Sequence, residues 1–403
     1  MGETIKIAIL SYKPITKPYD GYGQAIVNEA RLLQRLNNDV AIFSIGKKEE
    51  IVIVPEGIRQ YIVKGYTLRE SGLGITRLLD FIILFLFGVR PSIYFLNKNR
   101  RLQAQIINFK PTVLILPSTY MVDLAIQCIK NSRNSSVITY TDAFDTIVSS
   151  FNTIYFLKIP RFIKPILKIF YKKYKAHVYL LYKRLLNISE IIVVPTKQDK
   201  ISIIREFSRE VAGKSIFIIP PVIMKQNTQK HNKNEVRHIN TITFIGTARY
   251  FPNEGAVSII KTKIAPKLPK IKFLIVGKGW KKEKNKNIEI IGEVDDLNTV
   301  FDKTDAFIAP ITSGAGMKTK IATYLEAGKP IIGTSVAFEG YGIKDKVDGI
   351  VEDNLESIYK RIGDLNENPR KILTIQKNMR KILIKFSEEA IVRKWKKVIN
   401  KIE

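Results

Sequence analysis

The sequence predicts an α/β fold of two Rossmann-like, doubly wound domains that face a cleft. Three observations predict it. The chain has 403 residues, a length that suggests two domains. Short apolar runs of strand length alternate with helical patterns, as in parallel sheets with crossover helices. This alternation forms two successive series, separated at 225–240 by a polar stretch without an apolar period.

The first series opens with a strand and a loop rich in proline and glycine. In that loop Gly21 and Gly23 precede a helix predicted at 24–36. Doubly wound sheets bind ligands at the carboxyl ends of their strands, so the two glycines are candidates for a binding loop. An ordinary turn between strand and helix is the alternative. Strands are predicted at 5–10, 40–45, 112–116, 137–141, 191–195 and 215–219.

Two aspartates follow the strand predicted at 137–141. Asp142 and Asp145 therefore lie at a carboxyl end, where one of them is a candidate for orienting an acceptor hydroxyl. A solvated loop or a helix cap is the alternative. Earlier in this half, the apolar run 78–87 is too short to span a bilayer, and we favour a buried helix over one lying in a membrane interface.

A basic stretch at 156–184 follows these aspartates. No acidic residue occurs between Asp145 and Glu190, and nine lysines and arginines there alternate with aromatic and aliphatic residues. This pattern is typical of an amphipathic helix on an anionic membrane. A solvated basic face over an ordinary core is the main alternative, and no nucleic-acid motif accompanies the charge.

The second series spans a domain predicted at 225–386. The first domain takes 1–224 and is completed by a final helix at 387–403, which contains Trp395. Strands are predicted at 241–246, 272–277, 289–291, 306–311 and 345–351.

The stretch 313–334 is the most informative part of the sequence. Gly314 and Gly316 form a loop after an apolar strand, and a helix predicted at 317–327 follows. Gly328 occupies a helix stop, and a new apolar run leads to Thr334. Three features of this stretch predict an anion site: the unpaired N–H groups at a helix start, glycines that let the backbone approach a ligand, and the charges of Lys318 and Lys320.

Composition narrows the partners and the chemistry. The net charge of +29 implies a polyanionic ligand or surface. One cysteine excludes an internal disulfide framework, and no signal peptide or membrane-spanning run is found, so we expect a cytoplasmic protein. Three scattered histidines give no metal-ligand spacing, and no Asp-x-Asp triplet occurs. We therefore expect no metal and no cofactor.

At this point the second half resembles the retaining glycosyltransferases of the two-Rossmann (GT-B) fold, in the group that includes bacterial mannosyltransferases. The matching segments are FIGTARYFPNEGA (244–256), FLIVGKG (273–279), IIGEVDDL (290–297), DAFIAPITSGAGMKTK (305–320), AGKPIIGTSVAFEG (327–340) and DGIV (348–351). Their order and spacing are those of the family's donor domain. The first half matches more loosely, through its glycine loop and strand order.

The resemblance implies a nucleotide-sugar donor bound by the second domain. Lys318, Lys320 and Arg249 would carry the catalytic charge near the phosphates. The other donor-binding candidates are Gly246, Gly314, Gly316, Met317, Thr323, Glu326, Glu339 and Gly340. Gly21, Gly23, Asp142 and Asp145 would lie on the acceptor side.

One position departs from the family pattern. The family carries a ribose-binding Glu five residues before the glycine that corresponds to Gly328, and here that position is Thr323. Glu326 follows three residues later on the same helix face, displaced by about 4.5 Å along the axis. Because a hydroxyl cannot make the paired hydrogen bonds of a carboxylate, we expect altered or weaker nucleotide binding.

We therefore expect a hexosyltransferase that moves a sugar from a nucleotide-sugar to a hydroxyl acceptor, lipid-linked or glycan, with retention of configuration. The stretch 156–184 would contact the inner face of an anionic membrane. A catalytically silent nucleotide-sugar-binding protein is the first alternative. A sugar-nucleotide epimerase on the same fold is disfavoured because no convincing acid/base pair is found.

Overall fold

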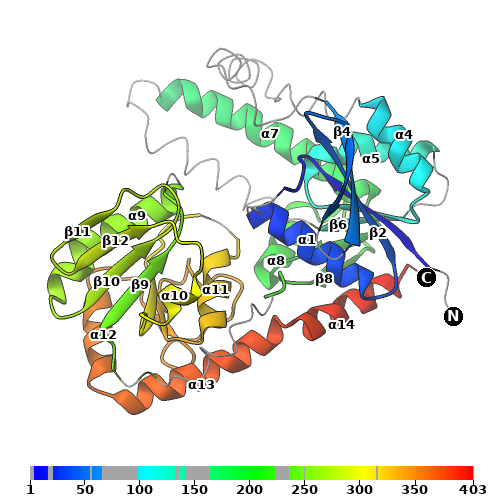
Figure 1. Ribbon diagram of the computed structural model, residues 1–403. Coiled ribbons are helices and arrows are strands. Elements are labelled where there is room, and N and C mark those ends of the chain that lie inside the picture. Colours follow the sequence, from blue (N-terminus) through cyan, green and yellow to red (C-terminus); the bar gives the residue numbers. More distant parts are fainter. Residues whose placement is uncertain are drawn as a thin grey trace. The chain divides into compact units, whose positions relative to one another are not determined.

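The computed structural model describes residues 4–16, 21–54, 57–65, 99–131, 136–140, 164–223, 236, 238–248, 250–314 and 316–402 (Figure 1). The chain forms two compact units. Unit 1 comprises Met1–Val222 and Ile391–Glu403, and unit 2 comprises Ile223–Ala390.

Unit 1 is built on an eight-stranded sheet of order β3-β4-β2-β1-β5-β6-β7-β8. All neighbouring strands are parallel except β3, which pairs antiparallel with β4. The strands are β1 (Lys6–Ser11), β2 (Asp39–Gly46), β3 (Glu50–Val54), β4 (Ile58–Lys64), β5 (Val113–Leu116), β6 (Ser136–Tyr140), β7 (Ile191–Val194) and β8 (Ser215–Ile218). The central strands are apolar and fully buried, which is typical of a parallel sheet covered on both faces.

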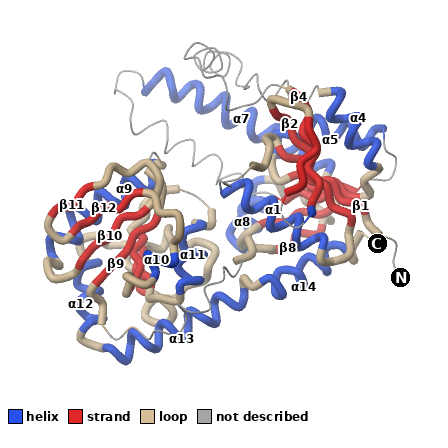
Figure 2. Tube along the Cα trace, viewed as in Figure 1, coloured by secondary structure: helices blue, strands red, loops and turns tan. Residues whose placement is uncertain are grey.

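The helices of unit 1 connect and cover these strands (Figure 2). They are α1 (Gly21–Gln34), α4 (Arg100–Phe109), α5 (Val122–Asn131), α7 (Lys164–Ile188), α8 (Lys197–Glu206) and α14 (Glu388–Ile399), with a short 3₁₀ turn at Thr119–Met121. The start of α1 corrects a prediction. Gly21 and Gly23 lie in the first turn of α1 rather than in a loop before it. The first N–H groups of a helix need no intrahelical partner, so glycine is tolerated there more easily than in the interior.

Unit 2 repeats the same arrangement on a seven-stranded sheet of order β11-β12-β10-β9-β13-β14-β15. Only β11 is antiparallel to its neighbour. The strands are β9 (Thr241–Ile245), β10 (Lys272–Val276), β11 (Glu283–Asn285), β12 (Ile288–Gly292), β13 (Ala306–Ala309), β14 (Ile331–Gly333) and β15 (Ile350–Val351). Without their antiparallel edge strands, both sheets have the Rossmann order, which confirms the predicted fold class.

The helices of unit 2 are α9 (Phe251–Ile259), α10 (Asn298–Phe301), α11 (Thr319–Ala327), α12 (Ile358–Asn366) and α13 (Pro369–Lys385), with short helical turns at Ile260–Ile264 and Ala265–Lys267. Gly328 ends α11 as predicted. Its φ of 67° is left-handed, and its N–H donates to the carbonyl of Leu325.

The polar stretch 225–240, which we expect to be a linker or exposed loop between the two series, is only partly described, and its last residues correct that prediction. Val236 and Ile239 are buried in the core of unit 2. The N–H of Val236 donates to the side chain of Gln376 at 3.0 Å, and that of Ile239 donates to Asn366 at 2.7 Å. These contacts join the stretch to α12 and α13, and such long-range pairing leaves no periodic signal in the local sequence.

The basic stretch 156–184 falls largely on α7. From Val178 onward α7 is an ordinary core helix, because Tyr182, Leu185 and Leu186 are fully buried. Lys183 forms an ion pair with Glu210 at 3.1 Å, and Arg184 forms one with Asp123. No helix in the described part of the chain is long and apolar enough to span a bilayer. The run 78–87 and residues 156–163 lie outside the described residues.

Candidate functional site

The candidate site lies where the strand order of unit 2 reverses. Strand β9 pairs with β10 on one side and with β13 on the other. The loops that leave β9 and β13 therefore depart from neighbouring carboxyl ends toward opposite faces of the sheet. This topological switch point is where open α/β sheets bind ligands. Both loops contain residues that the sequence singled out.

Glycines let these loops approach one another closely. A Cβ added to Gly246, directly after β9, would lie 2.8 Å from the amide carbon of Asn253. A Cβ added to Gly277, after β10, would lie 2.2 Å from the carbonyl oxygen of Gly246. In the loop after β13, Gly314 and Gly316 have φ values of 95° and 72°, which side-chain-bearing residues rarely adopt. The backbone conformation at Gly314 and Gly316 is therefore sufficient to explain glycine at these two positions.

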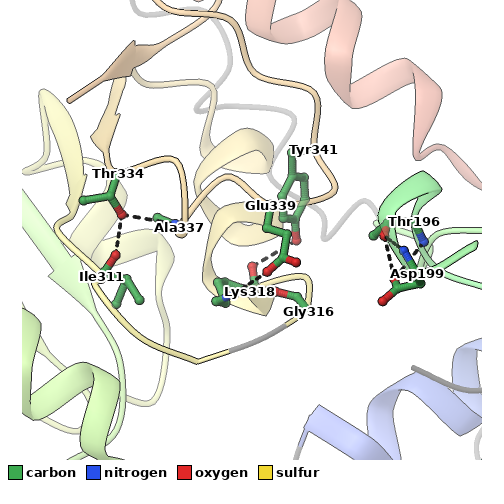
Figure 3. A network of polar contacts seen from close by, with 9 residues as sticks. All are labelled: Thr196, Asp199, Ile311, Gly316, Lys318, Thr334, Ala337, Glu339 and Tyr341. Carbon is green, nitrogen blue, oxygen red and sulfur yellow. Dashed lines mark hydrogen bonds and ion pairs between the residues drawn. The ribbon is translucent and has the colours of Figure 1, made fainter. Parts of the chain in front are cut away.

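Lys318 holds the loop that precedes α11 (Figure 3). Its Nζ donates to the carbonyl of Gly316 at 2.5 Å and to Oε2 of Glu339 at 3.2 Å. The side chain of Lys318 is 8% exposed, whereas that of Glu339 is 32% exposed. Lys318 is also the N-cap of α11, which begins at Thr319. The predicted start at Met317 was thus two residues early, because the lysine is still extended, with ψ 109°.

The loop after β14 is tied to the same place. The buried hydroxyl of Tyr341 donates to the carbonyl of Lys318 at 2.9 Å, and burial raises the pKa of this phenol. Thr334 begins the loop: its hydroxyl donates to the carbonyl of Ile311 and accepts from the N–H of Ala337 at 3.2 Å (Figure 3). Lys318 is thereby held through its side chain by Glu339 and through its backbone by Tyr341.

Lys320 lies in a different environment from Lys318. Its Nζ is 4.2 Å from the ring centroid of Phe244 on β9 and donates to Oδ1 of Asn253 on α9. In the described part of the chain no carboxylate forms an ion pair with it. Burial, followed by repulsion from Lys318, lowers the pKa of Lys320 to about 7. Lys320 is therefore the cationic group at the site with an uncompensated desolvation cost.

Sequence reasoning missed Asn253. It is 4% exposed, and its Nδ2 donates to the carbonyl of Thr247 at 2.8 Å. The PNEG run at the start of α9 was part of the family resemblance, but nothing local to it indicates a contact with a lysine 67 positions away. Tyr341 was missed for the same reason, since its partner Lys318 is 23 positions away.

The remaining positions on α11 divide by exposure. Met317 and Thr323 are partly buried, and Glu326 is 6% exposed. Tyr324, which follows Thr323, is fully buried. Its hydroxyl accepts a hydrogen bond from the N–H of Ile245 at 2.8 Å, and this bond ties α11 to β9. The burial of Glu326 disfavours direct contact with a ligand, whereas Thr323 remains accessible on the helix.

The structure brings together only part of the predicted set. Gly246, Gly314, Gly316, Lys318, Lys320, Glu339 and Gly340 lie on the loops and the helix start around the switch point of unit 2. Gly21 and Gly23 belong to unit 1. Arg249, Asp142 and Asp145 lie outside the described residues, so their roles stay predictions.

The described residues offer neither a cluster of metal ligands nor a reactive thiol for chemistry at the site. Among the described residues no group of three or more His, Cys, Asp and Glu side chains could hold a metal ion. The single cysteine, Cys128, is on α5 of unit 1 and 1% exposed, and burial raises its pKa to about 12. Such a thiol is a core side chain rather than a nucleophile.

Comparison with known proteins agrees with this geometry. Residues 239–368, which contain every element of the switch point, match the family described as glycosyl transferases group 1. The match is to a glycosyltransferase domain, so this part of the chain resembles that family. This domain coincides with most of unit 2, and Lys318, Lys320 and Asn253 all lie within it.

Solved structures extend the likeness in fold to nearly the whole chain. Sucrose-phosphate synthase from Thermosynechococcus elongatus has 13% identity and a TM-score of 0.69, with 99% of each chain covered. TarM has 10% identity and a TM-score of 0.70, again with 99% of each chain covered. HepE from Anabaena, in complex with UDP and glucose, has 11% identity and a TM-score of 0.65, with 98% of this chain and all of HepE covered. These likenesses establish the GT-B fold. No curated protein matches the sequence.

Proposed function

We propose that this glycosyltransferase moves a hexosyl group from a nucleotide-sugar to a hydroxyl acceptor with retention at the anomeric carbon. The observation that carries the proposal is the pair Lys318 and Lys320 at the start of α11, on glycine loops at the switch point of a group 1 domain. Closely approaching backbone, a helix N-terminus and two lysines together match the charge and shape of a diphosphate.

The chemistry follows from the charge that develops. The bond from the anomeric carbon to the diphosphate oxygen breaks, and a bond to the acceptor oxygen forms on the same face. The acceptor's proton passes to an oxygen of the leaving diphosphate, so no base from the protein is required. Negative charge grows on that leaving group, and Lys318, Lys320 and the first N–H groups of α11 stabilise it. Lysines perform this task without a metal ion.

UDP-sugars are the first donors to test, because HepE binds UDP and glucose on the same fold. Thr323 supports the alternative of a weakly active or silent binding protein. It supplies one hydroxyl at the position where the family resemblance implies a ribose-binding carboxylate. The two functions differ in turnover of the donor rather than in binding.

The acceptor proposal rests on α7. Lys172, Lys173 and Lys175 near its N-terminal end are exposed. From Val178 onward the helix is packed into the core of unit 1, where Lys183 and Arg184 form ion pairs. We therefore restrict the membrane contact of 156–184 to its first part and propose a lipid-linked acceptor. Co-flotation with anionic but not neutral vesicles supports this contact, and loss of flotation in the triple variant K172E/K173E/K175E assigns it to α7. Absence from anionic vesicles contradicts it.

Donor binding and turnover test the central proposal. Thermal-shift screening of UDP-, GDP- and ADP-sugars should give one class that raises the melting temperature, since a ligand that binds only the folded state stabilises it. Hydrolysis of that donor without acceptor then separates a transferase from a silent binder. Lys320→Met should abolish turnover, while the exposed Lys377→Met on α13 should leave it unchanged. Turnover that survives Lys320→Met contradicts the proposed site.

A further inference from the structure

Two lysines of one helix turn are held by opposite means. Lys318 has a carboxylate, Glu339, at 3.2 Å. Lys320 has a neutral amide oxygen, that of Asn253, and the face of the Phe244 ring. An amide oxygen orients a donor without neutralising a charge. Among the described residues, therefore, nothing balances the charge of Lys320.

The geometry of Asn253 leaves it no other role toward Lys320. An amide has one accepting oxygen and one donating nitrogen, and the carbonyl of Thr247 can only accept. Nδ2 must therefore face Thr247, and Oδ1 must face Lys320. Gly246 provides the room, since a Cβ there would lie 2.8 Å from the Asn253 amide. Both ends of the side chain are fixed before any ligand arrives.

Several titratable side chains lie on the helices and loops around Lys320. The titratable groups on the elements around it are Lys318 at the N-cap of α11, Tyr324 and Glu326 on α11, Tyr250 and Glu254 at the start of α9, and Glu339 and Tyr341 after β14. Within the described residues Lys318 is the one charged group that acts on the pKa of Lys320, and it lowers it. Arg249 lies outside the described residues.

We infer that Asn253 is a positioning residue that presents Lys320 to the donor diphosphate with a neutral hydrogen-bond acceptor, so that the ligand itself supplies the counter-charge. The inference rests on the proposed function, because it needs a diphosphate at this site. A carboxylate in place of the amide would also accept a hydrogen bond from Lys320. It would, however, neutralise the charge of the lysine before the ligand binds.

A measurable consequence is proton uptake on binding. With a pKa of about 7, Lys320 is mostly neutral at about pH 8, and the diphosphate restores its charge. Binding should then take up close to one proton, and affinity should fall about tenfold per pH unit above about pH 7. The ligand does not account for this, since a terminal phosphate with a pKa of about 6 has already lost its proton.

The experiment is calorimetric titration of the full chain with UDP, and with GDP and ADP as base controls, at about pH 8 in two buffers of different ionisation enthalpy. The wild type should show net proton uptake. Asn253→Asp should bind without uptake, because Lys320 is already charged beside a carboxylate. Lys320→Met should also lose the uptake. Asn285→Asp, on the exposed strand β11, adds the same charge elsewhere and should behave as wild type.

The outcomes separate the inference from the proposed function. Binding without proton uptake by the wild type overturns the inference alone, and that measurement needs no variant to fold. Uptake retained in Asn253→Asp also overturns it, since a merely structural Asn253 would change affinity but not the proton count. Failure of all three nucleotides to bind at millimolar concentration overturns both.

Discussion

Both units bury ionisable side chains, but they differ in the partners that offset the cost of removing a charge from water. In unit 2 the buried Lys318 and the partly buried Lys320 each have a hydrogen-bond acceptor, a carboxylate for Lys318 and an amide for Lys320. In unit 1 Glu29 on α1 is 5% exposed, and neither of its carboxyl oxygens has a hydrogen-bond partner among the described residues. It lines a small cavity with Tyr140, Trp395 and the Pro220–Pro221 turn. Burial raises the pKa of Glu29 to about 8.

The difference shows what a partner does for a buried charge. A group with an opposite charge stays ionised, and a group with a neutral partner stays oriented but is easily discharged. A group with no partner becomes neutral and makes stability depend on pH. The same sheet topology therefore carries the proposed site for a charged ligand in unit 2 and a titrating core position in unit 1.

Of the three substitutions that test this comparison, Lys318→Ala should have the largest effect. It removes a cation beside the developing diphosphate charge, so transfer should fall by about 10²- to 10³-fold, the loss typical of one stabilising donor. Steady-state kinetics with the donor found by screening measure it, with exposed Lys377→Ala as the control. Glu339→Gln breaks the same ion pair but keeps the cation. An equal loss in Glu339→Gln would show that Lys318 acts only through Glu339.

Glu29→Gln should change how stability depends on pH. The folded state keeps a proton that the unfolded chain releases between about pH 4.5 and about pH 8, so the wild type loses stability as pH rises through this range. The slope is about 1.4 kcal/mol per pH unit, and the amide variant lacks it.

Urea unfolding of both proteins at three pH values within that window measures this difference. The free energy of unfolding of Glu29→Gln should exceed that of the wild type by a margin that grows as pH rises. Glu50→Gln, on exposed β3, should follow the wild type. Parallel pH profiles for wild type and Glu29→Gln would mean that Glu29 is solvated.

Thr323→Glu should have the smallest of the three effects and the opposite sign. A carboxylate at this accessible position can make paired hydrogen bonds to a ribose, so UDP should bind about tenfold more tightly, a gain of about 1.4 kcal/mol. Titration calorimetry measures it, and Thr374→Glu on α13 controls for the added charge. Unchanged or weaker binding would show that α11 presents no ribose to position 323.

Local patterns predicted much of the fold and half of the site. Apolar runs located most of the parallel strands to within one or two residues, and Gly328 located the end of α11. Strand β15 covers only the last two residues of the strand predicted at 345–351. Strands β3 and β4 were missed because β3 is a half-exposed edge strand with Ile51 and Ile53 in solvent and thus lacks the buried apolar run. The sequence also indicated Lys318 and Lys320 but not what holds them, because Glu339, Tyr341 and Asn253 reach them across loops and strands.

The burial of Cys128 has a practical consequence for experiments on this protein. It is the only thiol in the chain, and with a pKa of about 12 it carries almost no thiolate near neutral pH. A cysteine introduced at an exposed position such as Lys377 would then be the single site that reacts with a maleimide dye. For labelling, the wild type therefore behaves like a protein without cysteine. One added substitution is enough to attach a dye whose fluorescence can follow donor binding.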